Sequence, residues 1–288
     1  MSEPELLAPE RLDQALELLS EAAAGAPPTV LAGGTDLWVR WSSGQPRPAR
    51  VLSLHRLTEL RQIGIDEDGW LRLGAACTHA ELRRSLEVQR ACPALAEAAA
   101  TVGAAQVQEQ GTLGGNLVNA SPAADLPPPL LAARAEVELA SRAGRRWLLL
   151  DRFFLGYRRI DLRPDELLVA VRVPPLPPPA FERFRKIGTR RAQAIAKVCG
   201  ACRLGLDEAG RVALAGLAFG SVAPITLRLE ELERWLVGRR LDVATAAEAE
   251  ERARAAVHPI DDVRSTAEYR RSMVGRLVGD WILAAATR

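Results

Sequence analysis

The sequence has 288 residues, 48% of them hydrophobic and 26% charged, so two or three compact units are expected. Its formal net charge of +2, without a basic stripe, lends no electrostatic support to nucleic-acid binding. No apolar run approaches the ~18 residues of a membrane span, and the acidic, polar start does not resemble a signal peptide, so we expect a cytoplasmic protein.

Short strands and helices alternate in the first hundred residues. Residues 11–24 place leucine and alanine at helical spacing, and Thr78 and Glu81 have the spacing of a capping box, which predicts the start of a helix. The predicted elements are a helix at 11–24, strands at 29–32, 51–54 and 70–73, and helices beginning at Thr78 and running from Pro93 to about Val102.

The second half begins with segment 111–129, GTLGGNLVNASPAADLPPP, which we expect to be neither helix nor strand. The stiff, proline-rich run 174–179 predicts a boundary between domains. Strands that are followed by helices are typical of an α+β fold. The elements predicted here are strands at 136–139, 167–173, 181–188, 194–206 and 211–220, followed by three helices, the last of them capped by Ser265 with Glu268 and ending near Ala286.

Four cysteines are present, and a disulfide framework does not suit an intracellular protein of this size. Cys199 and Cys202 have the C-x-x-C spacing of a metal or redox site. They lie, however, in an apolar run of small residues that predicts a buried strand. We therefore interpret both as core cysteines and leave open whether either has a further role.

Two segments with paired glycines stand out, residues 31–36 (LAGGTD) and residues 112–125 (TLGGNLVNASPAAD). Paired glycines allow consecutive backbone N–H groups to turn toward one point, and such groups bind phosphate oxygens. Two of these sites, together with the hydroxyls of Thr35, Thr112 and Ser121, could serve the two phosphates of a dinucleotide. Each pair could equally form a simple tight turn. Neither segment matches the Rossmann or Walker pattern, so spacing alone leaves the ligand open.

Four segments in order carry a resemblance over essentially the whole length: residues 31–37, 112–125, 153–174 and 184–198. Together they resemble the FAD-binding subunit of molybdenum hydroxylases, a family that includes xanthine dehydrogenase, aldehyde oxidase, carbon monoxide dehydrogenase and 4-hydroxybenzoyl-CoA reductase. The stretch GYRRIDLRPDELL favours the xanthine dehydrogenase branch. We find no cysteine-bearing insertion of the kind that adds an iron–sulfur cluster in the benzoyl-CoA reductase branch.

The resemblance implies a non-covalent FAD site, with no catalytic residue and no metal ligand in this chain. The first glycine segment is expected to wrap the pyrophosphate and the second to complete the cradle. Asp125 is expected at the adenosine ribose, Leu168 against the flavin, and Lys186 near the isoalloxazine, with Arg190 and Arg191 close by. The predicted cofactor-binding residues are Leu31, Ala32, Gly33, Gly34, Thr35, Asp36, Thr112, Gly114, Gly115, Asn116, Ser121, Asp125, Leu168 and Lys186.

Each of these assignments has a plainer alternative. Asp125 could be a surface or helix-capping carboxylate, Leu168 an ordinary core residue, and Lys186 a solvated strand residue. The family fold implies two FAD-binding subdomains of the vanillyl-alcohol-oxidase (PCMH) type at 1–56 and 57–175. A C-terminal α+β domain of the carbon monoxide dehydrogenase flavoprotein type, a three-stranded sheet with helices, is expected at 178–288.

The resemblance also implies partners. The molybdenum cofactor is expected on a large subunit and the [2Fe–2S] clusters on a small subunit of a heterotrimer, with electrons passing through FAD to NAD+ or another acceptor. One alternative is a free-standing FAD-dependent oxidoreductase on the same fold. It would need its own acid or base, and Tyr157 and Tyr269 are the only tyrosines. The other is a flavin-free assembly subunit, against which the intact glycine pairs count.

Overall fold

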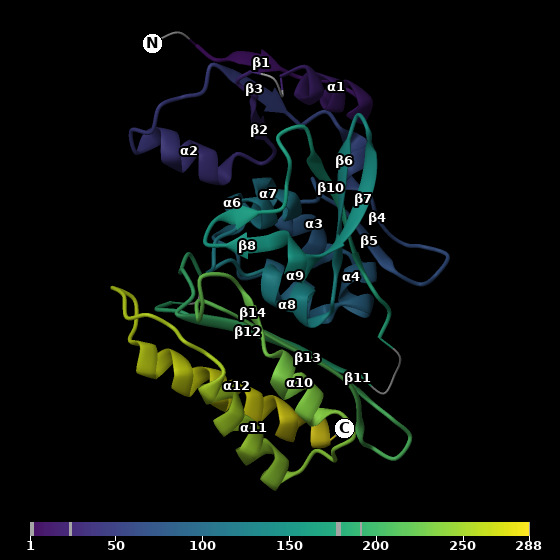
Figure 1. Ribbon diagram of the computed structural model, residues 1–288, viewed down its shortest axis with the longest axis vertical. Coiled ribbons are helices and arrows are strands. Elements are labelled where there is room, and N and C mark those ends of the chain that lie inside the picture. The colour runs from purple at the N-terminus through teal and green to yellow at the C-terminus, as the bar shows by residue number, and fades with distance from the viewer. Residues whose placement is uncertain (1–2, 23–24, 177–179, 191, 288) are drawn as a thin grey trace.

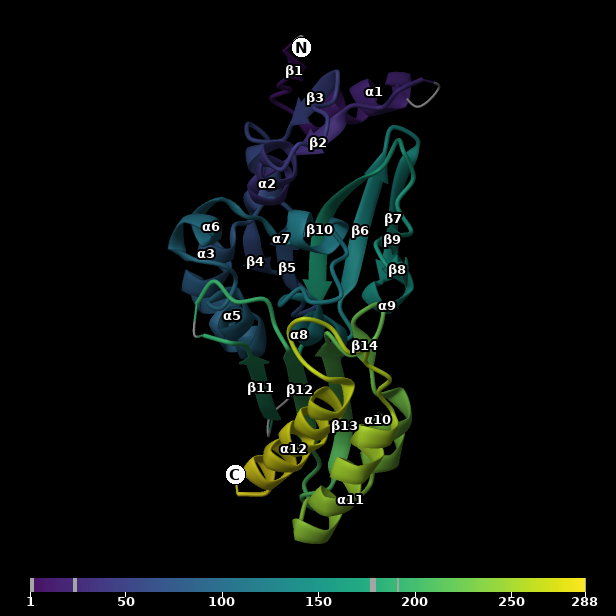
Figure 2. The ribbon, with the colours of Figure 1, turned by 90° about the vertical axis from the view of Figure 1, so that its left-hand side faces the viewer.

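The computed structural model describes residues 3–22, 25–176, 180–190 and 192–287. Its strands form sheets of three, five and four strands, which follow one another along the long axis from the N-terminus to the C-terminus (Figures 1 and 2), and a separate two-stranded hairpin. This mixture of helices and sheets agrees with the predicted α+β class. In the described part of the chain, no helix is long and apolar enough to cross a membrane.

The N-terminal unit is a small parallel sheet in the order β1-β3-β2. Its predicted amphipathic helix is present and buries Leu12, Ala15, Leu16 and Leu19. The three-residue β1 was not predicted. The elements of this unit are β1 (Glu5–Leu7), α1 (Leu12–Ala22), β2 (Thr29–Leu31), α2 (Thr35–Ser42) and β3 (Arg50–Ser53).

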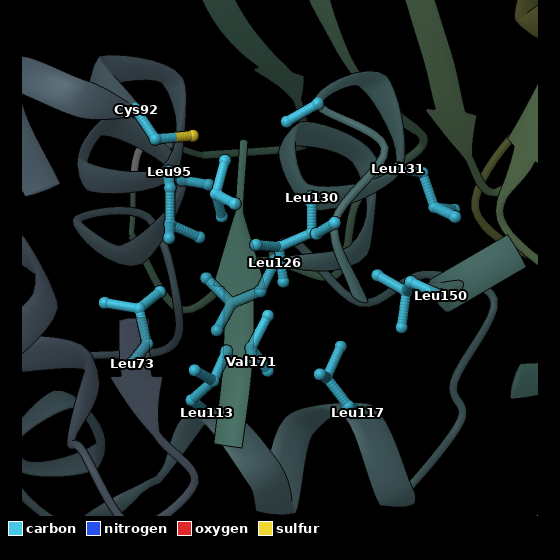
Figure 3. Close-up of a cluster of buried hydrophobic side chains, with 14 of the residues drawn as sticks. Leu73, Cys92, Leu95, Leu113, Leu117, Leu126, Leu130, Leu131, Leu150 and Val171 are labelled. Carbon is cyan, nitrogen blue, oxygen red and sulfur yellow. The ribbon is translucent and has the colours of Figure 1, made fainter. Parts of the chain in front are cut away.

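The central unit is an antiparallel sheet in the order β4-β5-β10-β6-β7. Leucines and valines from the sheet and from the neighbouring helices converge in one core, where Leu73, Leu113, Leu126 and Val171 face one another (Figure 3). The elements are η1 (Thr58–Arg61), β4 (Ile63–Ile65), β5 (Leu71–Gly74), α3 (His79–Arg84), α4 (Leu86–Ala91), α5 (Pro93–Ala99), α6 (Ala105–Gln110), α7 (Leu113–Val118), α8 (Pro127–Ala132), β6 (Glu136–Ser141), β7 (Gly144–Leu149), α9 (Leu150–Phe153), β8 (Phe154–Gly156), β9 (Arg159–Ile160) and β10 (Leu167–Val173).

The expectation that segment 111–129 lacks regular structure is wrong, because it contains α7 and α8. Thr112 caps α7 by accepting a hydrogen bond from the Gly115 N–H at 3.1 Å. Glycine is a poor helix former, so α7 depends on the tertiary burial of Leu113 and Leu117. The first turn of α8 consists of prolines, which that position tolerates since its N–H groups have no partner within the helix.

The C-terminal unit is an antiparallel sheet in the order β11-β12-β13-β14, with three helices on the face away from the central unit (Figure 2). The three predicted strands are present, and the two-residue β14 adds a fourth that was not expected. The last helix is capped by Thr266 rather than Ser265, which pairs with Asp262 in a turn. The elements are β11 (Ala180–Ile187), β12 (Val198–Leu206), β13 (Val212–Gly220), β14 (Leu227–Arg228), α10 (Glu230–Leu236), α11 (Val243–Ala255) and α12 (Ala267–Ala286).

The chain passes from one of the three larger sheets to the next at two places. The expected division between residues 56 and 57 falls between the first sheet and the second, after β3 and before η1. The second change occurs between β10 and β11. The expected start of the last domain at residue 178, like residues 177–179 of the proline-rich run, lies outside the described residues.

Strand β12 separates two hydrophobic cores. Cys199 and Ala201 pack into the central core, whereas Val198 and Cys202 pack against the C-terminal helices. Side chains alternate between the two faces of a strand, so residues three apart point in opposite directions. The two thiols of the C-x-x-C pattern are both buried and free, and they face opposite ways. They do not form one ligand set, and both are core residues as interpreted.

A buried ion pair joins β11 and β12 at the face that meets the central unit. The Arg203 Nε lies 3.0 Å from the Glu182 Oε1, and each side chain is only 3% exposed. Glu182 also accepts from the Ala94 N–H at 3.4 Å, and Arg203 donates to the Pro174 carbonyl at 2.7 Å. These bonds fasten the C-terminal sheet to α5 and to the end of the central sheet.

Replacing Glu182 with Ala should lower the free energy of unfolding by about 3–5 kcal/mol, because it leaves the Arg203 guanidinium buried without a counter-ion. Urea unfolding followed by circular dichroism measures the change. Glu248→Ala is the control. It removes an exposed i,i+4 pair with Arg252 and should cost less than about 1 kcal/mol. Equal losses in the two variants would contradict a structural role for the buried pair.

Candidate functional site

The two glycine segments, far apart in the sequence, meet where the N-terminal and central units join. A Cβ built on Gly33 would lie 1.8 Å from the carbonyl oxygen of Gln110, at the end of α6. Only glycine therefore fits at residue 33. This close approach places the first segment beside Gly111 and Thr112, where the second segment begins. The structure thus brings together two motifs that the sequence separates by about eighty residues.

The first segment ends in a set of unused backbone donors. Gly34 is the N-cap of α2, with a φ of 71° in the left-handed region and no side-chain cap. Among the described residues, the N–H groups of Gly33, Gly34, Thr35 and Asp36 donate to no acceptor. The first turn of a helix is an anion site, since its free N–H groups and the helix dipole both favour negative charge. This segment therefore has the donors that a pyrophosphate requires.

The second segment uses its backbone differently. The N–H groups of Leu113 and Gly114 donate to the carbonyls of Cys77 and Ala75 at 2.9 and 2.7 Å, and that of Gly115 donates to its own cap, Thr112. The first segment therefore keeps its backbone N–H groups free, whereas those of the second segment are already used within the protein. A Cβ on Gly114 would lie 2.9 Å from Ala75. A glycine is therefore required at residue 114 for packing. The predicted contact of Gly114 with a cofactor stays a prediction.

A polar network ties α2 to the end of α7. Arg40 pairs with Asp36, with 2.5 Å between Nη2 and Oδ2, and also bonds the side-chain oxygen of Asn119. Asn119 in turn donates to Asp36 at 3.4 Å. Because Arg40 compensates the Asp36 carboxylate, that carboxylate opposes a bound anion less. Sequence reasoning missed Arg40 and Asn119, although the i,i+4 spacing of Asp36 and Arg40 was a usable signal.

Two further residues beside the glycine segments were also missed. The Trp38 indole packs over Gly34, with its Cδ1 3.1 Å from where a Cβ of residue 34 would lie, and the side chain is 54% exposed. On the other side, the His79 ring lies against Gly111. Burial lowers the pKa of His79 to about 4, so the imidazole is neutral near pH 7. Both rings therefore border the place where the two segments meet.

Asp125 and Lys186 form an ion pair inside the protein. The Lys186 Nζ lies 2.5 Å from the Asp125 Oδ2 and donates to the Thr101 carbonyl at 3.0 Å. Asp125 is 5% exposed, and burial raises its pKa to about 6 even though Lys186 opposes the shift. The side chain is therefore neither a surface carboxylate nor a helix cap, and Lys186 is not a solvated strand residue.

The remaining predicted residues lie apart from the first glycine segment or have other partners. Leu168 is 5% exposed and belongs to the central core. The Ser121 hydroxyl accepts from the Ala123 N–H at 3.3 Å. The Arg190 guanidinium donates to the carbonyls of Ala192 and Gln193, and Arg191 lies outside the described residues.

Three buried side-chain oxygens have no hydrogen-bond partner among the described residues: Asn116 Oδ1 and Asp125 Oδ1, which belong to the second glycine segment, and Asp151 Oδ1 in α9. Buried acceptors without partners are rare in folded proteins. The donors of an FAD, its ribityl and ribose hydroxyls and its ring N–H, are the kind of group that would satisfy the first two. The unused amides of the first segment complement its phosphates. The residues present therefore fit FAD.

Two families match the chain and together span nearly all of it. Residues 2–176 match the family described as "FAD binding domain in molybdopterin dehydrogenase", and residues 183–285 match "CO dehydrogenase flavoprotein C-terminal domain". The chain is 31% identical to the xanthine dehydrogenase FAD-binding subunit of Escherichia coli O157:H7, over 89% of each chain. It is also 31% identical to the carbon monoxide dehydrogenase medium chain of Hydrogenophaga pseudoflava, over 98% of this chain and 96% of the relative.

The fold agrees with these matches. A solved carbon monoxide dehydrogenase from Hydrogenophaga pseudoflava, which lacks the Mo-pyranopterin moiety of its cofactor, contains a chain similar to this one with a TM-score of 0.92 and 29% identity. The similarity covers 99% of this chain and 98% of that chain. The N-terminal, central and C-terminal units of this chain therefore occur together in a chain of a solved carbon monoxide dehydrogenase.

The variant Gly33→Ala should push the first segment away from Gln110, since the added methyl group has no room. We expect a stability loss of about 1–3 kcal/mol, as for other overpacked sites, and a marked fall in the FAD retained through gel filtration. Gly64→Ala is the matched control, because nothing lies within 4 Å of a Cβ there. Flavin content and thermal midpoint are measured for both variants. Wild-type values for Gly33→Ala would refute the close contact.

Proposed function

The chain belongs to the family of FAD-binding medium subunits of molybdenum hydroxylases, and on that basis we propose that it holds FAD non-covalently and relays electrons within such a complex. It receives them from [2Fe–2S] centres on a small partner subunit and passes them to NAD+ or another acceptor. The molybdenum cofactor belongs to a large partner subunit. The observation that supports the proposal most strongly is the row of unused amides at Gly33–Asp36, held against the second glycine segment.

In this proposal the first glycine segment binds the pyrophosphate. Its four free N–H groups donate to phosphate oxygens, and the α2 dipole adds a favourable field. The second segment supplies side chains rather than amides. Thr112 keeps its hydroxyl hydrogen available after accepting from Gly115, and Asn116 offers a buried free oxygen. These groups orient the cofactor, which supplies the one- and two-electron chemistry when bound.

The remaining predicted contacts belong to the other end of the cofactor. Lys186 brings the buried ammonium group that sequence reasoning assigned to the flavin, and Leu168 on β10 belongs to the core of the central unit. A cation beside the flavin favours the negative charge that reduction adds. Because no residue is assigned to acid–base attack on an organic substrate, we expect the isolated chain to be inactive on such a substrate.

The substrate of the complex follows from the partner. Relatives of equal identity to this chain carry the names of xanthine dehydrogenase and carbon monoxide dehydrogenase, whose substrates share no chemistry. A flavin subunit of one family that occurs in complexes with such different substrates does not by itself account for the choice of substrate. We therefore assign the selection of the substrate to the molybdenum-bearing subunit. We expect the present chain to be able to serve complexes that act on different substrates.

Purification of the chain alone, followed by its visible spectrum and release of the chromophore on denaturation, tests the proposal. We expect the absorption maxima of an oxidised flavin and an equimolar yield of FAD. The released chromophore should be FAD rather than FMN, because the pyrophosphate site needs both phosphates. A colourless chain that does not take up added FAD would contradict the proposal. Oxidation of an organic substrate by the chain alone would favour a free-standing oxidoreductase instead.

A further inference from the structure

The Asp125–Lys186 pair spans two units of the fold. Asp125 lies just before α8 in the central unit, whereas Lys186 comes from β11 of the C-terminal unit. The two side chains are 6% and 11% exposed, and 2.5 Å separates the Lys186 Nζ from the Asp125 Oδ2. The ammonium group also donates to the Thr101 carbonyl, beyond the end of α5. Its position is therefore set by two contacts that the central unit makes across the domain junction.

This contact bears on the roles that the resemblance assigns. Asp125 was expected at the adenosine ribose and Lys186 at the isoalloxazine, which are opposite ends of FAD. A carboxylate and an ammonium group in direct contact serve one region of a ligand. Because the proposed function places Lys186 beside the flavin, the direct contact assigns Asp125 to that end as well. Its second oxygen, Oδ1, is buried and has no partner among the described residues, so it can accept a further hydrogen bond.

We propose that Asp125 is a positioning residue for Lys186, holding its ammonium group in place and offsetting its charge, and that the pair thereby tunes the reduction potential of the bound flavin. The inference rests on the proposed FAD site. An ammonium group that is free favours the negative charge of a reduced flavin strongly, and one that is paired with a carboxylate favours it less. The ion pair accordingly holds the potential below the value that Lys186 alone would give.

The surroundings of Asp125 make the same pair sensitive to pH. The groups that face it are Lys186 from β11, the Cys199 thiol from β12 and Thr101 after α5. Burial raises the pKa of Cys199 far above neutrality, so this thiol stays uncharged. The pKa of Asp125 is raised to about 6 by burial. Below that pH the carboxyl group becomes neutral, the charge of Lys186 is no longer offset, and the flavin is easier to reduce.

Opposite substitutions should therefore move the potential in opposite directions. Asp125→Asn keeps the shape and removes the negative charge, so the potential should rise above that of the wild type at pH values well above 6. Lys186→Met removes the cation, so the potential should fall. We expect each change to alter the preference for reduced flavin about tenfold, which corresponds to about 30 mV for a two-electron couple.

The potential is measured on the FAD-loaded chain by equilibration with reference dyes across a pH series. Lys197→Met is the control, because it removes a lysine charge elsewhere in the same unit. The Lys197 Nζ lies 5.4 Å from the Tyr269 ring centroid. This variant should leave the reduction potential unchanged. Below pH 6, the reduction potential of the Asp125→Asn variant should equal that of the wild type, because Asp125 is then neutral in the wild type as well. Of the wild type and the Asp125→Asn variant, only the wild type should show a change in reduction potential near pH 6 that comes from the titration of Asp125.

The outcomes separate this inference from the FAD proposal. Shifts of opposite sign in Asp125→Asn and Lys186→Met, with the convergence at acid pH, support the tuning role. Equal potentials, or shifts of the same sign, overturn it while leaving the FAD proposal intact, since the flavin is bound throughout. A wild-type chain that binds no FAD overturns both. If a variant does not retain FAD, the pH dependence of the wild type decides, and its absence near pH 6 overturns the inference.

Discussion

The contact of Gly33 with the Gln110 carbonyl is the constraint on which the site depends. It leaves no room for a side chain at residue 33, and it holds the N-terminal sheet against the end of α6. As a result the free amides of α2 lie beside Thr112, the cap of α7. The Asp36–Arg40–Asn119 network fastens the other side of α2 to α7. The site thus forms where the N-terminal and central sheets meet, through this backbone contact, the polar side-chain network and a shared hydrophobic core.

The two glycine pairs look alike in the sequence and have different physical roles. Gly33 and Gly34 free the backbone for a close approach and a left-handed turn, which leaves the following N–H groups unused. Gly114 lets a short helix pack directly on Ala75, and its N–H is consumed by that packing. The Gly33–Gly34 pair therefore provides hydrogen-bond donors, and the Gly114–Gly115 pair provides a rigidly packed helix beside them. A preorganised anion site requires both, because flexible donors would lose the entropy of ordering on each binding event.

Local patterns in the sequence predicted most of the longer strands, the order of strands before helices in the C-terminal unit, and the capping of α3 by Thr78, which the structure confirms, but they missed β1, β7 and β14. The same patterns failed for α7 and α8, since glycine and proline disfavour helices and only tertiary burial offsets that preference. They also failed for contacts between distant residues. The Asp125–Lys186 and Arg40–Asn119 bonds join residues about sixty and eighty positions apart, and no periodicity encodes such pairs. The resemblance named Asp125 and Lys186 but not their contact.

Two buried carboxylates, Glu182 and Asp125, lie at the junction of the central and C-terminal units and differ in their hydrogen-bond partners. Both oxygens of Glu182 are satisfied, by Arg203 and by the Ala94 N–H, so the protein itself completes that carboxylate. Asp125 keeps one oxygen without a partner, although burying it costs stability and raises its pKa. Buried acceptors without a hydrogen-bond partner are uncommon in folded proteins. The unfilled acceptor of Asp125 is therefore better explained by a ligand than by poor packing, and its link to Lys186 joins that ligand to the charge of the C-terminal unit.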